Sequence, residues 1–152
     1  MFATILIIGV SLGLFFYWFR YTAILILRTR SAPQYAQKVA AANHLSFFGV
    51  RQKLHTPEPG ELTSLFSALQ RDYKALKYLL GHAATVEAGS YTAEQRLLMA
   101  NYRVMTVWFR IIWRFRPATA KMALLEMSGT LEYFANAMGQ RFATLASDAV
   151  RA

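Results

Sequence analysis

An uncharged run at residues 2–19 constrains the fold of this chain more than any other feature of its sequence; it reads FATILIIGVSLGLFFYWF. In a helix, these eighteen residues rise about 27 Å at about 1.5 Å each, close to the roughly 30 Å hydrocarbon thickness of a bilayer. Arg20 interrupts the run, and YTAILIL then continues the apolar pattern to Leu27. We therefore expect residues 1–30 to form a single transmembrane anchor with a basic flank.

A secretory signal peptide is the competing interpretation of this run. Such peptides begin with basic residues, have an apolar core of about 7–15 residues and end at a site with small side chains. This chain has no Lys or Arg before Arg20, its apolar run is longer, and Arg30 stands where a small residue should precede cleavage. These features favour an uncleaved anchor. The core helix of a soluble protein is the remaining alternative.

Aromatic and basic residues follow the run where a membrane boundary is expected. Trp and Tyr rings prefer the headgroup level, and an Arg side chain there extends toward water. We predict as membrane-interface residues Tyr17, Trp18, Arg20, Tyr21, Arg28 and Arg30.

The charges around the run predict its orientation. Flanks rich in Lys and Arg stay on the cytoplasmic side of a membrane, and no acidic residue precedes Glu58. We expect an inner (cytoplasmic) membrane protein with its N-terminus outside and residues 31–152 in the cytoplasm. The basic flank then meets anionic lipid, which contributes about 1 kcal/mol per cation close to the surface.

Gly9 and Gly13 give the run a GxxxG spacing. Small residues four positions apart let a second membrane helix approach closely. The spacing therefore predicts a helix-packing face, for another subunit or for a homo-oligomer. Chance is the competing explanation, because glycine is common in membrane helices.

The remainder of the chain shows no sustained period-2 alternation and predicts an all-α fold. The predicted helices cover residues 33–54, 61–80, 93–115 and 117–149. We expect these four helices to form a small antiparallel bundle, because the connections between them are short.

Local signals set the predicted ends of these helices. Gly81 is a candidate C-terminal cap, and Thr92 with Gln95 has the spacing of a capping box. In the last helix Ala135, Gly139 and two further small residues recur every fourth position. Small side chains at that spacing predict unusually close helix packing.

The segment 93–115 is the most informative of the predicted helices. One stripe of the helix carries Arg96, Arg103, Arg110 and Arg114, whose steps of 7, 7 and 4 residues keep them within about 40° of one another. Almost everything else on this helix is apolar, including Trp108 and Trp113. A surface helix needs an apolar arc of only about 100°, and this arc is more than twice as wide.

Three interpretations of this helix remain open. It is the central helix of the bundle, with its arginines exposed or paired to carboxylates at Glu126, Glu132 or Asp72. Alternatively, it is a docking surface for another subunit, since Trp and Arg are enriched at interface centres. In the third interpretation it lies against the membrane with its arginines on lipid phosphates.

Composition excludes several function classes. The chain has no Cys, three scattered histidines (His44, His55 and His82) and eight acidic residues. We therefore expect no metal site and no cofactor, and we find no nucleotide-binding or catalytic motif. The net charge of +9 favours anionic partners. The excess lies mostly at the membrane flank and in the apolar helix at 93–115, which argues against nucleic-acid binding.

The sequence thus predicts a non-catalytic accessory or scaffolding subunit that docks on a larger membrane protein complex. The alternative is a self-associating, membrane-organising protein that binds anionic lipid through the basic aromatic helix. An enzyme whose site is completed by a partner is a third, less supported interpretation.

Overall fold

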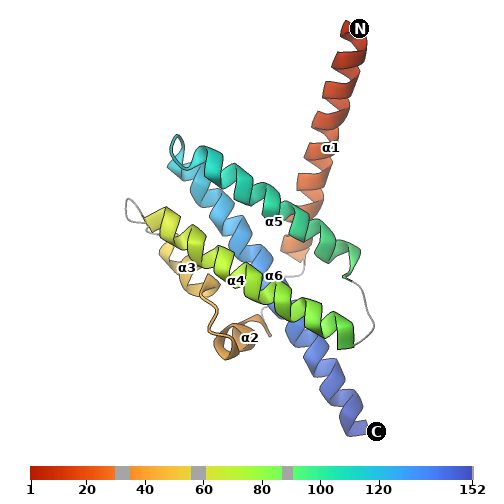
Figure 1. Cartoon of the computed structure of the whole chain (residues 1–152), viewed down its shortest axis with the longest axis vertical. Helices are drawn as coiled ribbons and strands as arrows, with labels where there is room; N and C mark the ends of the chain where they lie inside the picture. The colour runs from red at the N-terminus through yellow and green to blue at the C-terminus, as the bar shows by residue number, and fades with distance from the viewer. Residues whose placement is uncertain (30–34, 56–60, 87–90, 152) are drawn as a thin grey trace.

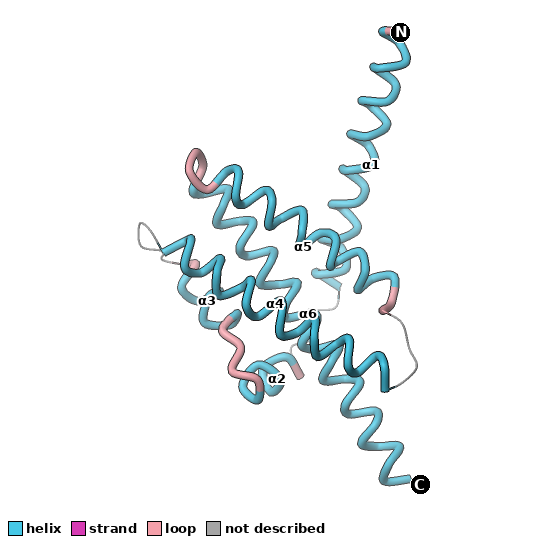
Figure 2. The backbone as a smooth tube through the Cα atoms, in the orientation of Figure 1, coloured by secondary structure: helices cyan, strands magenta, loops and turns pink. Residues whose placement is uncertain are grey.

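The computed structural model describes residues 1–29, 35–55, 61–86 and 91–151, and every regular element in these ranges is a helix (Figures 1 and 2). The elements are α1 (Phe2–Thr29), α2 (Ala36–Ala42), α3 (Phe47–Lys53), α4 (Glu61–Val86), α5 (Ala93–Ile112) and α6 (Pro117–Arg151). The prediction of an all-α protein with an apolar N-terminal helix is confirmed.

α1 projects away from the other helices (Figure 1). It is long and apolar enough to cross a membrane, with a mean hydropathy of 2.1 over its most apolar window. Every side chain from Phe2 to Trp18 is exposed, whereas Ala23, near the other end, is fully buried. Only the C-terminal part of α1 therefore packs on the rest of the protein, where it meets α5 and α6.

α6 is the central element and contacts each of the other five helices. Its apolar residues follow steps of three and four, which places them on one face. That face is fully buried at Leu124, Met127, Leu131 and Phe134. α4 and α5 lie along α6 as the other long members of the domain, and the short α2 and α3 cover its remaining side (Figure 2).

Stacked aromatic rings join α4 to α5. The Phe66 and Phe109 ring centroids are 4.4 Å apart, and those of Tyr73 and Tyr102 are 4.0 Å apart. The Tyr102 hydroxyl donates a hydrogen bond of 2.8 Å to the carbonyl of Leu69. These four rings are buried and fill the space between the two helices.

The predicted single helix at 33–54 is wrong, because the chain turns sharply after α2. His44 has a positive φ of 51°, and the Asn43 side chain donates to the carbonyl of Val39 at 2.9 Å. The buried Asp72 carboxylate then accepts hydrogen bonds from the Ser46 backbone N–H and hydroxyl, at 2.7 and 3.0 Å. The turn lets α3 insert Phe47 into the core.

The other boundaries follow the sequence signals more closely. The capping box of Thr92 and Gln95 is confirmed in both directions. Gly81 does not end α4, which continues to Val86. A side chain at Gly81 would instead meet the Tyr91 hydroxyl, since an added Cβ lies 3.1 Å from it. α5 ends at Ile112, and the predicted extension to residue 115 forms a turn.

The predicted close packing at Gly139 is confirmed. A Cβ added there would lie 2.3 Å from the Tyr35 Cβ and 3.3 Å from a methyl carbon of Val39. The approach of α2 to α6 therefore requires glycine at this position, which offsets its low helix propensity.

Candidate functional site

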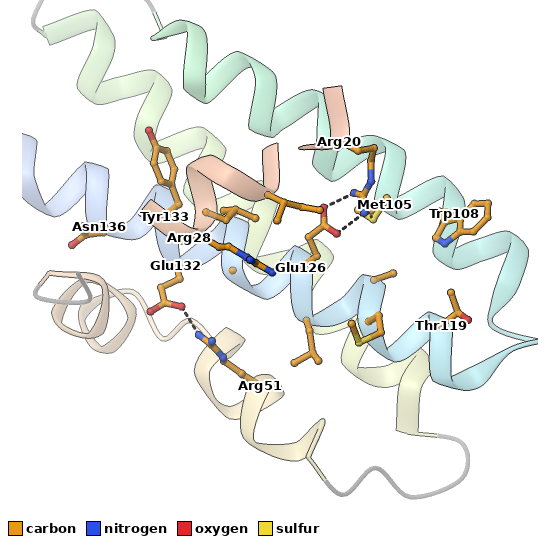
Figure 3. Close-up of a pocket in the computed structure, with 16 residues that line it drawn as sticks. Arg20, Arg28, Arg51, Met105, Trp108, Thr119, Glu126, Glu132, Tyr133 and Asn136 are labelled. Carbon is orange, nitrogen blue, oxygen red and sulfur yellow. Dashed lines mark hydrogen bonds and ion pairs between the residues drawn. The ribbon is translucent and has the colours of Figure 1, made fainter. Parts of the chain in front are cut away.

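The junction between α1 and the helical domain is organised around Arg20. Its guanidinium forms a bidentate ion pair with Glu126 of α6, in which Nη2 lies 2.8 Å from Oε2 and Nη1 contacts Oε1 (Figure 3). Nη1 also reaches Oδ1 of Asn101 at 3.1 Å and the sulfur of Met105 at 3.3 Å, both on α5. One arginine thus connects three helices.

Burial strengthens this cluster. Asn101 is fully buried, and its amide nitrogen donates to Oε1 of Glu126 at 2.7 Å. The Glu126 side chain is only 15% exposed and that of Arg20 is 32% exposed. Bidentate, charge-assisted hydrogen bonds are directional, and partly buried pairs are screened less by salt than surface pairs. The cluster therefore fixes the rotation of α1 against α5 and α6.

A second ion pair involves Glu132, six residues after Glu126 along α6. Arg51 of α3 donates to Glu132 at 2.6 Å, and the arginine side chain is about half exposed. Since such exposed pairs contribute about 0–1 kcal/mol, this contact orients α3 more than it stabilises the fold.

A cavity of about 660 Å³ lies between the C-terminal part of α1, α5 and α6, next to both ion pairs (Figure 3). Its lining comprises Arg20, Ile24, Leu27, Arg28, Arg51, Met105, Trp108, Thr119, Met122, Ala123, Leu125, Glu126, Gly129, Glu132, Tyr133 and Asn136. Both carboxylates are engaged by Arg20 and Arg51. The cavity therefore offers cationic and apolar surface rather than two free carboxylates for acid–base chemistry.

The predicted membrane-interface residues that the structure describes lie along the C-terminal half of α1. Tyr17, Trp18 and Tyr21 are exposed and contact one another, with ring centroids 5.9–6.5 Å apart. Arg28 is exposed and lines the cavity. Arg30 lies outside the described residues. Arg20 differs from its neighbours, because its guanidinium turns into the protein.

The predicted helix-packing face at Gly9 and Gly13 is open. A Cβ added at either position would meet no atom within 4 Å. The exposed backbone at these two positions is available to an apolar neighbour.

All four arginines of the predicted stripe are exposed, with Arg96, Arg103 and Arg110 on α5 and Arg114 in the turn that follows it. Arg114 lies over the ring of Trp113 at 5.2 Å, and Trp108 is 46% exposed. The opposite face of α5 is buried and includes Leu98, Tyr102 and Phe109. α5 thus contributes one face to the core and leaves the other uncovered.

One interpretation left the stripe either exposed or paired to Glu126, Glu132 or Asp72, and each of these carboxylates has a partner outside the stripe. Glu126 binds Arg20, Glu132 binds Arg51 and Asp72 accepts from Ser46. Neither of the two ion pairs between described residues involves an α5 arginine.

The buried tyrosines of the α4–α5 contact are poor acids. Burial raises the pKa of Tyr102 above its usual 10.0, and the neighbouring Tyr73 and Asp72 add to the shift. Burial also raises the pKa of Tyr73, an effect that the nearby Arg103 partly opposes. Both phenols therefore stay neutral at physiological pH and act as packing groups.

Sequence reasoning missed Asn101, and it named Glu126 only as a candidate partner of the arginine stripe rather than of Arg20. One signal was available, because a carboxylate that is largely buried beside an apolar helix face requires a cationic partner. The sequence did not show which of the many arginines that partner is.

Among the residues that the structure describes, no group of three or more His, Asp or Glu side chains is close enough to hold a metal ion. Comparison with protein-family models, curated proteins and solved structures finds no match for this chain. The arrangement of its own residues is therefore the basis for the function proposed below.

Proposed function

We propose that the protein is a non-catalytic, single-span membrane protein that serves as an accessory or scaffolding subunit of a larger membrane protein complex. In this proposal α1 crosses an inner (cytoplasmic) membrane with its N-terminus outside, and residues 31–152 form a cytoplasmic bundle of antiparallel helices. The observation that carries the proposal is that two uncovered surfaces, α1 and the outer face of α5, are joined through the Arg20 cluster.

The exposure of α1 supports the membrane anchor. Its side chains from Phe2 to Trp18 have no cover from the protein itself. Burying a Leu, Ile or Phe side chain away from water contributes about 1.5–3 kcal/mol, so the run strongly favours a lipid environment. The positively charged flank favours its cytoplasmic placement.

The outer face of α5 supports docking. Arg96 and Arg103 are exposed, and a cationic row of this kind favours an acidic partner surface. The Arg20 cluster would hold this row at a fixed position relative to the membrane. A partner that is itself a membrane protein can then contact both α1 and α5.

Size analysis in mild detergent tests the proposal. The full chain, isolated from the cells that produce it, should elute in a particle larger than its 17.3 kDa plus a micelle. The double variant Arg96→Glu/Arg103→Glu should lose this association with its helicity unchanged. The matched control Lys74→Glu/Lys77→Glu reverses two exposed cations on α4 and should retain it. A monomer that is insensitive to salt and to both variants would contradict the proposal.

A second candidate is a self-associating, membrane-organising protein that binds anionic lipid. The open face at Gly9 and Gly13 favours it, because no atom of the chain lies within 4 Å of an added Cβ there and small residues at this spacing let a second helix approach closely. In the same measurement, this candidate predicts a particle that contains only this chain. Its mass should fall to that of a monomer in Gly9→Leu/Gly13→Leu but not in Leu12→Ala/Leu14→Ala.

A further inference from the structure

The α5–α6 turn and the helix ends on either side of it carry five of the seven large apolar side chains that are exposed outside α1 in the described part of the chain. Phe115 is 81% exposed, the largest exposure of any such side chain in this part of the protein. We call these five exposed side chains the hairpin patch: Val107, Trp108, Ile111, Phe115 and Met122. Monomeric soluble proteins rarely leave such groups together in water, so the patch favours an apolar environment.

The patch is surrounded by positive charge. No acidic residue occurs between Glu94 and Glu126, while this stretch contains six cations. Arg110, Arg114 and Arg116 lie within the hairpin and are all exposed. Apolar side chains with interspersed arginines are typical of a surface that enters the boundary between acyl chains and phosphates.

The position of the α5–α6 turn relative to α1 indicates what the hairpin patch contacts. In Figure 1 the α5–α6 turn rises toward the end of the molecule that carries the N-terminus, to about the height of the lower half of α1, whereas the C-terminus of α6 points the opposite way. The exposed Tyr17, Trp18 and Tyr21 occupy that half of α1. A membrane whose boundary lies at these rings therefore also reaches the hairpin patch.

We infer that the α5–α6 turn is a second membrane contact, whose apolar side chains enter the cytoplasmic headgroup region while Arg110, Arg114 and Arg116 bind the phosphates of anionic lipid. This inference rests on the proposed span of α1, because the hairpin patch and the rings of Tyr17, Trp18 and Tyr21 must meet the same face of the membrane. With this contact, the outer face of α5 has two parts with different surroundings. The half near the turn contacts lipid, and the half with Arg96 and Arg103 faces the aqueous phase and remains available to a protein partner.

The absence of cysteine from the chain allows a direct test with single-cysteine variants. Phe115→Cys is labelled with an environment-sensitive fluorophore, and the full chain is reconstituted in vesicles of phosphatidylcholine with or without phosphatidylglycerol. Ile8→Cys in α1 is the control for a position in lipid, and Lys77→Cys on α4 is the control for a position in water. All three side chains are exposed, so labelling should leave the fold intact.

The label at position 115 should be quenched by nitroxide lipids carrying the spin label near the headgroup, whereas the label at position 77 should respond only to aqueous iodide. Quenching should be stronger with phosphatidylglycerol, and Arg114→Glu/Arg116→Glu should reduce it by about twofold or more, since each cation near an anionic surface contributes about 1 kcal/mol.

Three results would overturn the inference. A label at position 115 that behaves like the one at position 77 would place the turn in water, with the span of α1 intact. Protection of that label from both quenchers would show that protein, not lipid, covers the patch. If the label at position 8 also escapes the lipid quenchers, the proposed span itself fails and the inference fails with it.

Discussion

α1 and α6 are the longest helices that the structure describes, and their apolar side chains have opposite surroundings. α1 distributes Leu, Ile and Phe around its whole circumference, and its first seventeen residues are exposed on every side. α6 concentrates its apolar residues on one face, where Leu124, Met127 and Leu131 are fully buried. The comparison shows that arrangement, rather than apolar content, decides what a helix can pack against in a small domain.

The C-terminal part of α1 behaves like α6. From Phe19 to Leu27 most of its side chains are at least partly buried, and Arg20 joins the network of α5 and α6. α1 therefore combines an uncovered segment with a packed one. The predictions below test this difference between covered and uncovered surfaces.

The largest contrast should come from matched truncations in α6 and α1. Leu131→Ala removes a fully buried side chain and should lower the free energy of unfolding by about 2–5 kcal/mol. Leu6→Ala, at an exposed position, should change it by less than about 0.5 kcal/mol. Denaturant unfolding in mild detergent, followed by circular dichroism, measures both values. Equal losses would show that α1 is covered in the isolated protein.

Alanine at two glycines should have effects of opposite sign. Gly139→Ala forces a Cβ against Tyr35 and should destabilise the protein by about 1–3 kcal/mol despite the gain in helix propensity. Gly13→Ala meets no atom within 4 Å and should be neutral or slightly stabilising for the monomer. The same unfolding measurement applies, and a stable Gly139→Ala protein would contradict the close packing of α2 on α6.

Removing the carboxylate should destabilise the protein more at the partly buried Arg20–Glu126 pair than at the more exposed Arg51–Glu132 pair. Glu126→Gln leaves Arg20 without its carboxylate in a partly buried site, and should cost about 1–3 kcal/mol. Glu132→Gln faces a half-exposed Arg51 and should cost less than about 1 kcal/mol. Hydrogen exchange adds a local measurement: Glu126→Gln should accelerate exchange in residues 20–27, and Glu132→Gln should not.

The smallest expected effect concerns the Tyr73–Tyr102 stack. Tyr102→Phe removes the hydrogen bond to Leu69 and should cost about 1 kcal/mol. Because burial raises the pKa of both tyrosines above 10.0, the unfolded chain loses phenolic protons first, and stability should fall as the pH rises above about 10. A pH series of unfolding measurements should show a shallower fall for Tyr102→Phe than for the wild type.

Much of the fold could be predicted from local signals. The capping box at Thr92 and the tight packing at Gly139 were found because each depends on residues a few positions apart. The turn at residues 43–46 could not be found in this way. It depends on Asp72, a residue of a different helix, which binds the Ser46 backbone.

The candidate site was predictable only in part. The exposed stripe of α5 follows from helical spacing, which places Arg96, Arg103 and Arg110 correctly, whereas Arg114 lies in the turn after Ile112. The role of Arg20 in joining three helices did not follow, because its partners Asn101 and Glu126 are 81 and 106 positions away in the chain. Pairing between such distant residues depends on how the helices pack.

The sequence by itself determined where the long helices lie and which of them is too apolar for water, because helix periodicity and hydropathy are properties of neighbouring residues. Only the tertiary structure decided which charge meets which. Arg20 is held by Glu126 while the α5 arginines remain exposed, because the packing of α1 against α5 and α6 brings that one guanidinium, and none from the stripe, to the buried carboxylate.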